Sequence, residues 1–174
     1  MQERATTISS HLIFFTLELN RLEDAVLDGK CAASPALARF KPWLRDLRVF
    51  RPHQLSDEAE KLLHEKEVTG RSAWNRLFDE TISTMKVTVP LPTGAESLTV
   101  SDALNRLSDG DRAVREAAAK GISAAFAEKG RLFTLITNTL AKDKAIVDNW
   151  RRYPRPASAR NRANMVEDEV VEAL

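Results

Sequence analysis

Lys86-Val-Thr-Val-Pro-Leu-Pro-Thr-Gly-Ala-Glu-Ser-Leu-Thr-Val100 is the stretch in which the sequence leaves the helical pattern of the rest of the chain. Residues 86–89 and 97–100 alternate polar and apolar side chains with period two, which is typical of β-strands. Pro-Leu-Pro-Thr-Gly at 90–94 lies between them, and prolines with a glycine favour a turn. The sequence therefore predicts one β-hairpin over residues 86–100, and no second one.

The sequence after the hairpin predicts helices. Ser101 is expected to cap a short helix that ends near Leu107. The alanine-rich stretch 111–128 favours a strong helix, which Gly130 stops. A further long helix is predicted from Arg131 to about Trp150, before Pro154 and Pro156, and two short helices follow, the last from Glu167. The side chains of the long helix predicted to face inward are Leu132, Ile136, Leu140, Val147 and Trp150.

The sequence before the hairpin is also helical. Apolar residues recur in alternating steps of four and three, which marks one face of an α-helix: Ile8, Leu12, Phe15, Leu19, Leu22 and Val26. Ile13, Phe14 and Leu17 widen this surface, so we expect a partner segment, absent from this sequence, or a second copy of the chain to cover it. Asp28-Gly29 is predicted to end the helix.

Three further helices are predicted before residue 86. Ser34-Pro35 opens the first, and Arg51-Pro52 ends it. Ser56 caps a short helix that reaches Leu63. After a break at Thr69-Gly70, Ser72 is expected to cap a helix that carries the apolar side chains Trp74, Leu77, Phe78, Ile82 and Met85. The predicted fold class is all-α, mainly helical, with one small β-hairpin near residues 86–100, in a single helical segment spanning residues 1–174.

Composition narrows the class of protein. The chain has 174 residues, 43% of them hydrophobic and 29% charged, with a net charge of +1. These values are typical of a globular protein and do not indicate nucleic acid or an anionic membrane as a partner. The longest apolar run, Leu12 to Leu17, is too short to span a bilayer. A single cysteine, Cys31, and a polar start without a signal peptide favour the cytoplasm.

His64-Glu65-Lys66-Glu67-Val68 resembles half of a zinc-peptidase motif. The complete motif, His-Glu-x-x-His, places two imidazoles on one helix face, and its glutamate acts on the metal-bound water. Here Val68 replaces the second histidine, and His11 and His53 are distant in sequence. One imidazole does not hold zinc. The segment is therefore interpreted as a solvated helix end.

Two other reactive positions have an ordinary structural explanation. Cys31 would need a histidine base to act as a nucleophile, and its small-residue loop, Cys31-Ala-Ala-Ser34, favours an incidental thiol. Asp79 and Glu80 are adjacent on a predicted helix, where neighbouring side chains do not face each other. No catalytic, cofactor-binding or metal-binding residue is assigned to this sequence.

The segment from Arg151 to Arg162 carries five arginines and no acid, with Trp150 and Tyr153 beside it. Arginine together with aromatic rings is a pattern of nucleic-acid or anion surfaces. A solvated loop, neutralised by the acids at 167–169 and 172, is the alternative that a near-neutral chain favours.

Asp111-Arg-Ala-Val-Arg-Glu-Ala-Ala118 resembles one helix of a HEAT-type repeat, but no second copy exists in the sequence. Such repeats need several copies to be stable. A stand-alone helical interaction module without enzymatic activity therefore stays as the alternative function.

Longer segments carry a resemblance to a known family. In chain order they are Phe15-Thr-Leu-Glu-Leu-Asn-Arg-Leu-Glu-Asp-Ala25, Trp43-Leu-Arg-Asp-Leu47 with Arg51-Pro52, Thr69-Gly-Arg-Ser-Ala-Trp-Asn-Arg-Leu-Phe-Asp-Glu-Thr81, Phe133-Thr-Leu-Ile-Thr-Asn-Thr-Leu-Ala-Lys-Asp-Lys144, Ser158-Ala-Arg-Asn-Arg-Ala-Asn164 and Glu167-Asp-Glu-Val-Val171. Their order and spacing resemble oligoendopeptidase F and its relatives in the thimet oligopeptidase group. The resemblance runs over nearly the whole chain and includes the hairpin.

This resemblance implies a helical zinc endopeptidase of the cytoplasm that cuts short oligopeptides inside a deep channel. Its chemistry uses His-Glu-x-x-His with a downstream glutamate, and zinc activates the attacking water. That motif is absent here, and in the family it lies well beyond the region that this chain resembles. The expectation is therefore a non-catalytic helical portion, upstream of the catalytic region and forming part of the channel wall. Its expected partners are that missing C-terminal catalytic region and the peptide, and the chain alone is expected to bind no zinc and to be inactive.

Overall fold

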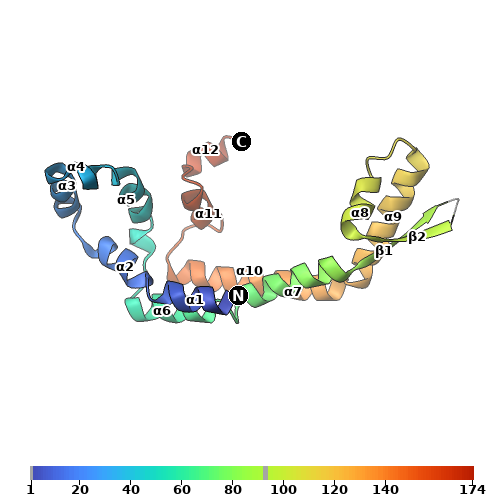
Figure 1. Cartoon of the computed structure of the whole chain (residues 1–174), viewed down its shortest axis with the longest axis horizontal. Helices are drawn as coiled ribbons and strands as arrows, with labels where there is room; N and C mark the ends of the chain where they lie inside the picture. The colour runs from blue at the N-terminus through green and yellow to red at the C-terminus, as the bar shows by residue number, and fades with distance from the viewer. Residues whose placement is uncertain (1, 92–93) are drawn as a thin grey trace. The chain divides into compact units, whose positions relative to one another are not determined.

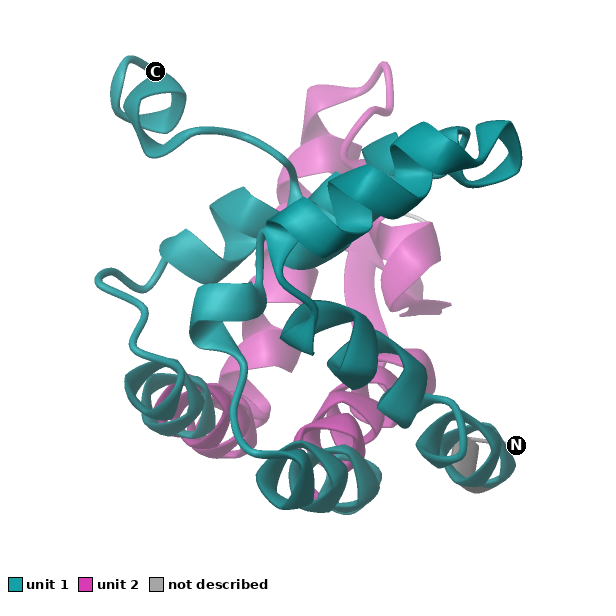
Figure 2. Cartoon of the chain, turned by 90° about the vertical axis from the view of Figure 1, so that its left-hand side faces the viewer, with its two compact units in different colours: residues 1–69, 143–174 teal, residues 70–142 magenta. Residues whose placement is uncertain are grey.

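The computed structural model describes residues 2–91 and 94–174 and is mainly helical, with one two-stranded antiparallel sheet (Figure 1). This confirms the predicted fold class. The chain divides into two compact units, which Figure 2 colours separately: residues 1–69 with 143–174 form unit 1, and residues 70–142 form unit 2. None of the helices in the described part of the chain is long and apolar enough to cross a membrane.

Unit 2 is built around the hairpin. Its elements are α7 (Arg71–Thr84), β1 (Lys86–Leu91), β2 (Gly94–Thr99), α8 (Val100–Arg106), α9 (Arg112–Glu128) and the first part of α10 (Gly130–Trp150). The strands pair in register from Lys86 with Thr99 to Leu91 with Gly94. The hairpin prediction is thus confirmed, except that Pro92 and Thr93 of its predicted turn lie outside the described residues.

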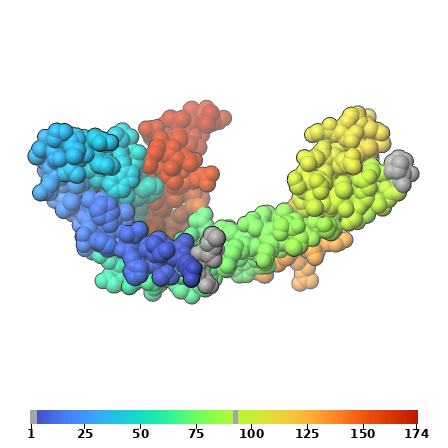
Figure 3. Space-filling view, in the orientation of Figure 1, coloured from blue at the N-terminus to red at the C-terminus, as the bar shows by residue number. Residues whose placement is uncertain are grey.

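The core of unit 2 forms where the hairpin meets α8 and α9. Its buried side chains are Met85, Val87, Val89, Val100, Ala103, Ala118 and Ala125. Alternation along β1 places Val87 and Val89 on the inner face, where both are fully buried. Figure 3 shows the outer atoms of the hairpin, α8 and α9 as one continuous body, coloured yellow-green to yellow. The period-two pattern seen in the sequence thus corresponds to alternating burial along β1.

Gly121 allows α9 to approach β1 closely. A Cβ at this position would lie 2.4 Å from the carbonyl oxygen of Thr88, well inside van der Waals contact. This carbonyl oxygen is part of the backbone of β1, so it cannot move aside as the end of a flexible side chain could. The small residue in the middle of α9 is therefore required by packing, and Gly121 is itself buried.

Two predicted helix caps in this unit are wrong. The N-cap of α8 is Thr99, whose hydroxyl accepts a hydrogen bond from the backbone N–H of Asp102 at 3.1 Å. Ser101 lies inside the helix because the chain turns directly from β2 into α8. Likewise α7 begins at Arg71 behind Gly70, so Ser72 lies within its first turn and caps nothing.

Unit 1 consists of short helices from both ends of the chain. They are α1 (Gln2–Ser10), α2 (Ile13–Arg21), α3 (Asp24–Ala33), α4 (Pro35–Ala38), α5 (Lys41–Arg48), the 3-10 turn η1 (Arg51–His53), α6 (Asp57–Lys66), the end of α10, α11 (Ser158–Ala163) and α12 (Asp168–Glu172). The cap at Ser56 is confirmed, because its side chain accepts from the N–H of Ala59 at 3.3 Å. The two short helices after Pro156 are confirmed as well.

The single long helix predicted at the start of the chain is wrong. The helix is interrupted at His11-Leu12 and again at Leu22-Glu23. At the second interruption Leu22 and Glu23 both have extended backbone. The second break has a visible cause. Arg48 of α5 donates to the carbonyl oxygens of Leu19 at 2.6 Å and Leu22 at 2.7 Å, so a distant side chain takes the bonds that a continuing helix would use.

Other boundaries in unit 1 also differ from the prediction. Gly29 lies inside α3, which ends at Ala33, where Ser34 is extended ahead of Pro35. The helix predicted from Ser34-Pro35 to Arg51 is split into α4 and α5 at Arg39-Phe40. Trp150, predicted to face inward, is 53% exposed.

Glu60 and Arg151 join the two stretches of chain that make up unit 1. The guanidinium binds both carboxylate oxygens, at 2.7 and 2.8 Å. Glu60 also accepts from the N–H of Leu55 at 2.9 Å, and Arg151 donates to the carbonyl of His53 at 3.2 Å. His53 is buried, and its Nδ1 lies 2.7 Å from the carbonyl oxygen of Arg151.

Burial acts to raise the pKa of Glu60, but the hydrogen bonds from Arg151 and Leu55 and the charge of Arg151 outweigh it, so the pKa lies below its ordinary value of 4.5. A carboxylate with a lowered pKa in the folded state stabilises the fold above the unfolded-state pKa. This contribution is lost as the pH falls through the lowered value.

We expect Gly121→Ala to destabilise the chain by about 1–2 kcal/mol, because the clash with Thr88 exceeds the gain from a better helix former. Gly29→Ala is the matched control: Gly29 also lies inside a helix but has nothing within 4 Å of its Cβ position. The control should be neutral or slightly stabilising. Urea unfolding measures both, and equal effects of the two substitutions would contradict the close contact.

We expect Glu60→Gln to destabilise the chain by about 1–3 kcal/mol at neutral pH, because it leaves the Arg151 guanidinium without its counter-charge. The difference from the unsubstituted chain should shrink below pH 4.5, as Glu60 itself becomes protonated. Glu96→Gln, in the exposed pair of Glu96 with Arg106, is the control and should cost less than about 1 kcal/mol. If Glu60→Gln lowered the free energy of unfolding equally at every pH, the charge of Glu60 would not be the source of its stabilising effect.

Candidate functional site

A hollow of ≈ 260 Å³ lies in unit 1 where the end of α10 meets the segment before α6. Its lining residues are Pro52, Gln54, Leu55, Ser56, Trp150, Arg151 and Arg152. The Glu60–Arg151 pair and the His53–Arg151 bonds hold these two segments together. The position of the hollow therefore follows from the same contacts that assemble unit 1.

The backbone turns sharply where α10 ends. The N–H of Tyr153 donates to the carbonyl of Asp148 at 2.9 Å, and that of Arg152 donates to Asn149 at 3.1 Å. This pair of bonds is the Schellman motif, whose second bond comes from a residue in the left-handed conformation, usually glycine. Here Arg152 occupies that position with φ 58°. A side chain in this conformation costs roughly 1–2 kcal/mol relative to glycine.

Tyr153 fixes the other side of this turn. Its ring stacks on His53 with 4.0 Å between ring centroids, and burial is the main reason that the pKa of the Tyr153 hydroxyl is raised. The Nε2 atom of His53 is buried and has no hydrogen-bond partner among the described residues. The stacked rings of His53 and Tyr153 therefore pack on the inner side of the turn, while Trp150 and Arg152 are exposed.

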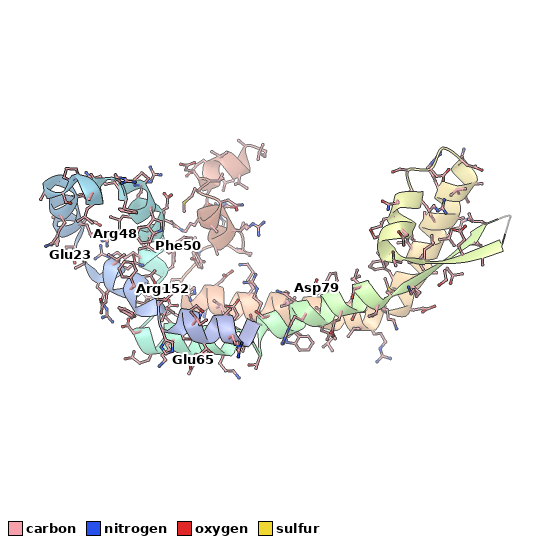
Figure 4. The ribbon with its side chains drawn as sticks, in the orientation of Figure 1. Glu23, Arg48, Phe50, Glu65, Asp79 and Arg152 are labelled. Atoms are coloured by element: carbon pink, nitrogen blue, oxygen red, sulfur yellow. The ribbon has the colours of Figure 1, made fainter. Side chains whose placement is uncertain are left out.

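The arginines of the segment from 151 to 162 differ in how they are neutralised. Arg151 is paired with Glu60, and Arg155 is paired with Asp168 at 2.6 Å and also with Glu172. A hydrogen bond from Asn161 and the pair with Arg155 lower the pKa of Asp168. In the part of the chain that the structure describes, the exposed side chain of Arg152 has no hydrogen bond or ion pair (its place is labelled in Figure 4).

A second, more open hollow of ≈ 430 Å³ adjoins α2 and the start of α6. Its lining residues are Asn20, Arg21, Arg51, Gln54, Leu55, Ser56, Asp57 and Glu58. The polar groups here largely satisfy one another: Asn20 donates to Gln54 at 2.9 Å, and Arg21 is paired with Asp57. The Oδ1 atom of Asn20 is the exception, since it is buried and has no hydrogen-bond partner among the described residues.

The structure places the residues singled out in the sequence far from any common site. His64 lies on α6, and its Nε2 is 2.7 Å from the hydroxyl of Ser9. The imidazole therefore forms a hydrogen bond with α1. Glu65 is exposed and pairs with Lys61 at 3.9 Å (Figure 4). Cys31 is buried within α3, not in a loop, with its Sγ 3.9 Å from the carbonyl of Leu37. Asp79 and the adjacent acid are exposed on α7 (Figure 4).

A metal ion held by side chains needs several ligands in one place. Among residues 2–91 and 94–174, no three histidines, cysteines, aspartates or glutamates come together in a way that could hold one. The residues that are described thus do not fit a catalytic zinc ion. That no residue of this chain is catalytic stays a prediction.

The sequence did not reveal the Glu60–Arg151 pair or the unpaired state of Arg152. The two partners of the pair are 91 residues apart, and nothing in one sequence links them. The Arg-rich segment itself was noticed. Of the acids expected to offset its charge, Asp168 and Glu172 form ion pairs with Arg155, whereas Arg151 is paired with Glu60 instead. The signal that could have singled out Arg152 is its place directly after the end of a long helix, where glycine is usual.

Comparison with known proteins gives one family and two solved structures. Residues 18–86 match the family model described as Oligopeptidase F. The oligoendopeptidase-F of Enterococcus faecium has a similar structure, with a TM-score of 0.81 and 23% sequence identity, over 96% of this chain and 33% of that one. No curated protein matches the chain.

A candidate peptidase of Chlamydophila abortus is similar as well, with a TM-score of 0.76 and 15% identity over 92% of this chain and 27% of that one. The chain thus spans a third or less of the solved structures that it matches. The resemblance to oligoendopeptidase F predicted from the sequence is confirmed: residues 18–86 match the family model, and the fold is similar over almost the whole chain.

Proposed function

We propose that this chain is the non-catalytic helical portion of a larger zinc metalloendopeptidase that hydrolyses short oligopeptides. The match of residues 18–86 to the Oligopeptidase F model is the observation that carries this proposal. The similarity in fold supports it, since 96% of the chain superposes on 33% of an oligoendopeptidase-F. On this proposal the remainder of the enzyme is the principal partner of the chain.

Zinc belongs to the proposed enzyme and not to this portion of it. The described residues bring together no group of ligands for a metal ion, and His64-Glu65 is engaged in contacts with Ser9 and Lys61. The His-Glu-x-x-His motif would then lie in the part of the enzyme beyond this region. No chemical step is assigned to a residue of this chain.

Forming part of the peptide channel wall is the role that we propose for unit 1. Where a channel wall packs against the rest of its enzyme, it needs apolar side chains at that surface. Unit 1 exposes many apolar side chains: Ile8, Leu12, Phe14, Phe15, Leu22, Val26, Leu37, Phe40 and Trp43. On this proposal other parts of the enzyme contact these side chains, as is usual where apolar side chains gather on a protein surface. Polar hollows beside it, lined in part by Arg152 and Ser56, suit a peptide backbone.

A stand-alone interaction module is the second candidate, and the same exposed apolar side chains favour it. In that case a second copy of the chain or another protein would cover them. Binding of nucleic acid is less favoured, because Arg151 and Arg155 are already paired with acids.

We expect the purified 174-residue chain to leave a fluorogenic oligopeptide intact, with or without added zinc. The native protein, isolated from its source with an antibody raised to this chain, should cleave the same peptide. The chelator o-phenanthroline should abolish that cleavage, and its non-chelating meta isomer, as the control, should not. Chelator-sensitive cleavage by the purified chain, or none by the native protein, would contradict the proposal.

A further inference from the structure

Arg152 is an unusual choice for its backbone position. Two non-glycine residues among those described have positive φ, Arg152 at 58° and Met165 at 52°. Each follows a helix that closes with the same pair of backbone bonds, since Val166 donates to Asn161 and Met165 to Arg162, both at 3.0 Å. Glycine would fit both positions without strain. A non-glycine residue held in this conformation points to a role for its side chain.

The charge of Arg152 is available to a ligand. The arginines on either side of it in the sequence, Arg151 and Arg155, are held by carboxylates. Both carboxylate oxygens of Glu60 already accept hydrogen bonds from Arg151. The guanidinium of Arg152 is thus the group lining this hollow whose positive charge no described acid neutralises.

The surroundings of Arg152 suit a small group that is partly anionic and partly apolar. Trp150 lines the same hollow and is 53% exposed, so one face of its indole can receive an apolar side chain. Pro52 and Leu55 also line the hollow, but its accessible lining is mainly polar, so Trp150 is the residue argued to receive the apolar part of a ligand. Ser56 lies at the N-terminus of α6, but Asp57, Glu58 and Glu60 already place their carboxylates in the first turn of that helix, so the attraction for a ligand carboxylate comes from Arg152. A volume of ≈ 260 Å³ admits an end or a side chain of a peptide, not a folded element.

From this arrangement we propose that the hollow between α10 and the start of α6 binds the carboxylate of a short peptide. Arg152 holds the carboxylate by charge-assisted hydrogen bonds, and the indole of Trp150 contacts the neighbouring apolar side chain. The carboxylate can come from the C-terminus of the peptide or from an aspartate or glutamate within it. This inference rests on the proposed function, because it names a feature of the peptide that the enzyme would recognise at its wall.

Binding of peptides to the 174-residue chain, followed by NMR, tests the assignment without any hydrolysis. Three probes differ only in their carboxylate: acetyl-Ala-Ala-Leu with a free C-terminus, the same peptide as its amide, and acetyl-Ala-Glu-Leu amide. The free acid, the glutamyl amide or both should shift the indole N–H signal of Trp150 and the backbone signals of residues 54–56 and 152. The neutral amide should not, and added salt should weaken the effect.

Arg152→Gly and Met165→Gly form a matched pair, because both relieve a left-handed backbone. Each should raise the melting temperature, by about 2–4 °C for a chain of this size. Arg152→Gly should weaken peptide binding about tenfold or more, whereas Met165→Gly should leave it unchanged. Arg152→Asn, which tolerates the left-handed conformation, provides a second uncharged variant.

The probes that bind identify the source of the carboxylate. Binding of the free acid alone assigns the site to the peptide C-terminus, and binding of the glutamyl amide alone assigns it to an acidic side chain. Equal binding of all three probes, no binding of any, or unchanged binding by the two Arg152 variants overturns the proposal. In that event chelator-sensitive cleavage by the native protein would still uphold the proposed function, so the two failures are distinguishable.

Discussion

The bidentate ion pair between Glu60 and Arg151 is the contact on which unit 1 depends. It joins parts of the chain 91 residues apart, and Arg151 extends it by a donated bond to His53. Breaking a partly buried pair leaves a charge without compensation, which costs far more than the pair gains over a well-packed apolar contact. Such a pair specifies one arrangement of its segments. The hollow beside Trp150 and Arg152 exists because that arrangement is fixed.

The two units are stabilised by different means. Unit 2 has an ordinary apolar core, in which Val87 and Val89 of the hairpin pack against the small residues of α9. Unit 1 buries little apolar surface: of the buried hydrophobic residues in the described chain, only Leu17 and Cys31 belong to it. Its buried polar residues are Asn20, His53, Ser158 and Asn161. A unit with so small an apolar core, and with Phe14 and Leu12 exposed, is the part expected to depend on further protein surface.

The sequence predicted local structure well where local chemistry decides it. The alternation at 86–89 and 97–100 identified the hairpin, and the Ser56 cap and the helices after Asp111 and Gly130 followed from capping and propensity. The long N-terminal helix was wrong for a reason outside its own segment, because Arg48 takes the carbonyl oxygens of Leu19 and Leu22. A periodic pattern does not reveal such a distant donor.

The candidate site was only partly predictable for the same reason. The cluster of arginines was visible in the sequence, but which of them remains unpaired depends on Glu60 and Asp168, which only the fold brings close. Trp150 was assigned to the core from its helical spacing. The helix ends there, and the turn at Arg152 leaves the indole at the surface. The resemblance to oligoendopeptidase F rested on the order of several weak motifs. It does not depend on the predicted bounds of individual helices, so the errors in those bounds did not affect it.

The mass of the native protein in its source cells shows whether this chain is one portion of a larger enzyme. An antibody raised to this chain, used in an immunoblot under denaturing conditions, measures it. If the chain is a portion of a larger metallopeptidase, the band should be several-fold heavier than 19.5 kDa, since the chain spans 33% of the oligoendopeptidase-F that it resembles. A band at 19.5 kDa would exclude the larger enzyme and favour a stand-alone interaction module.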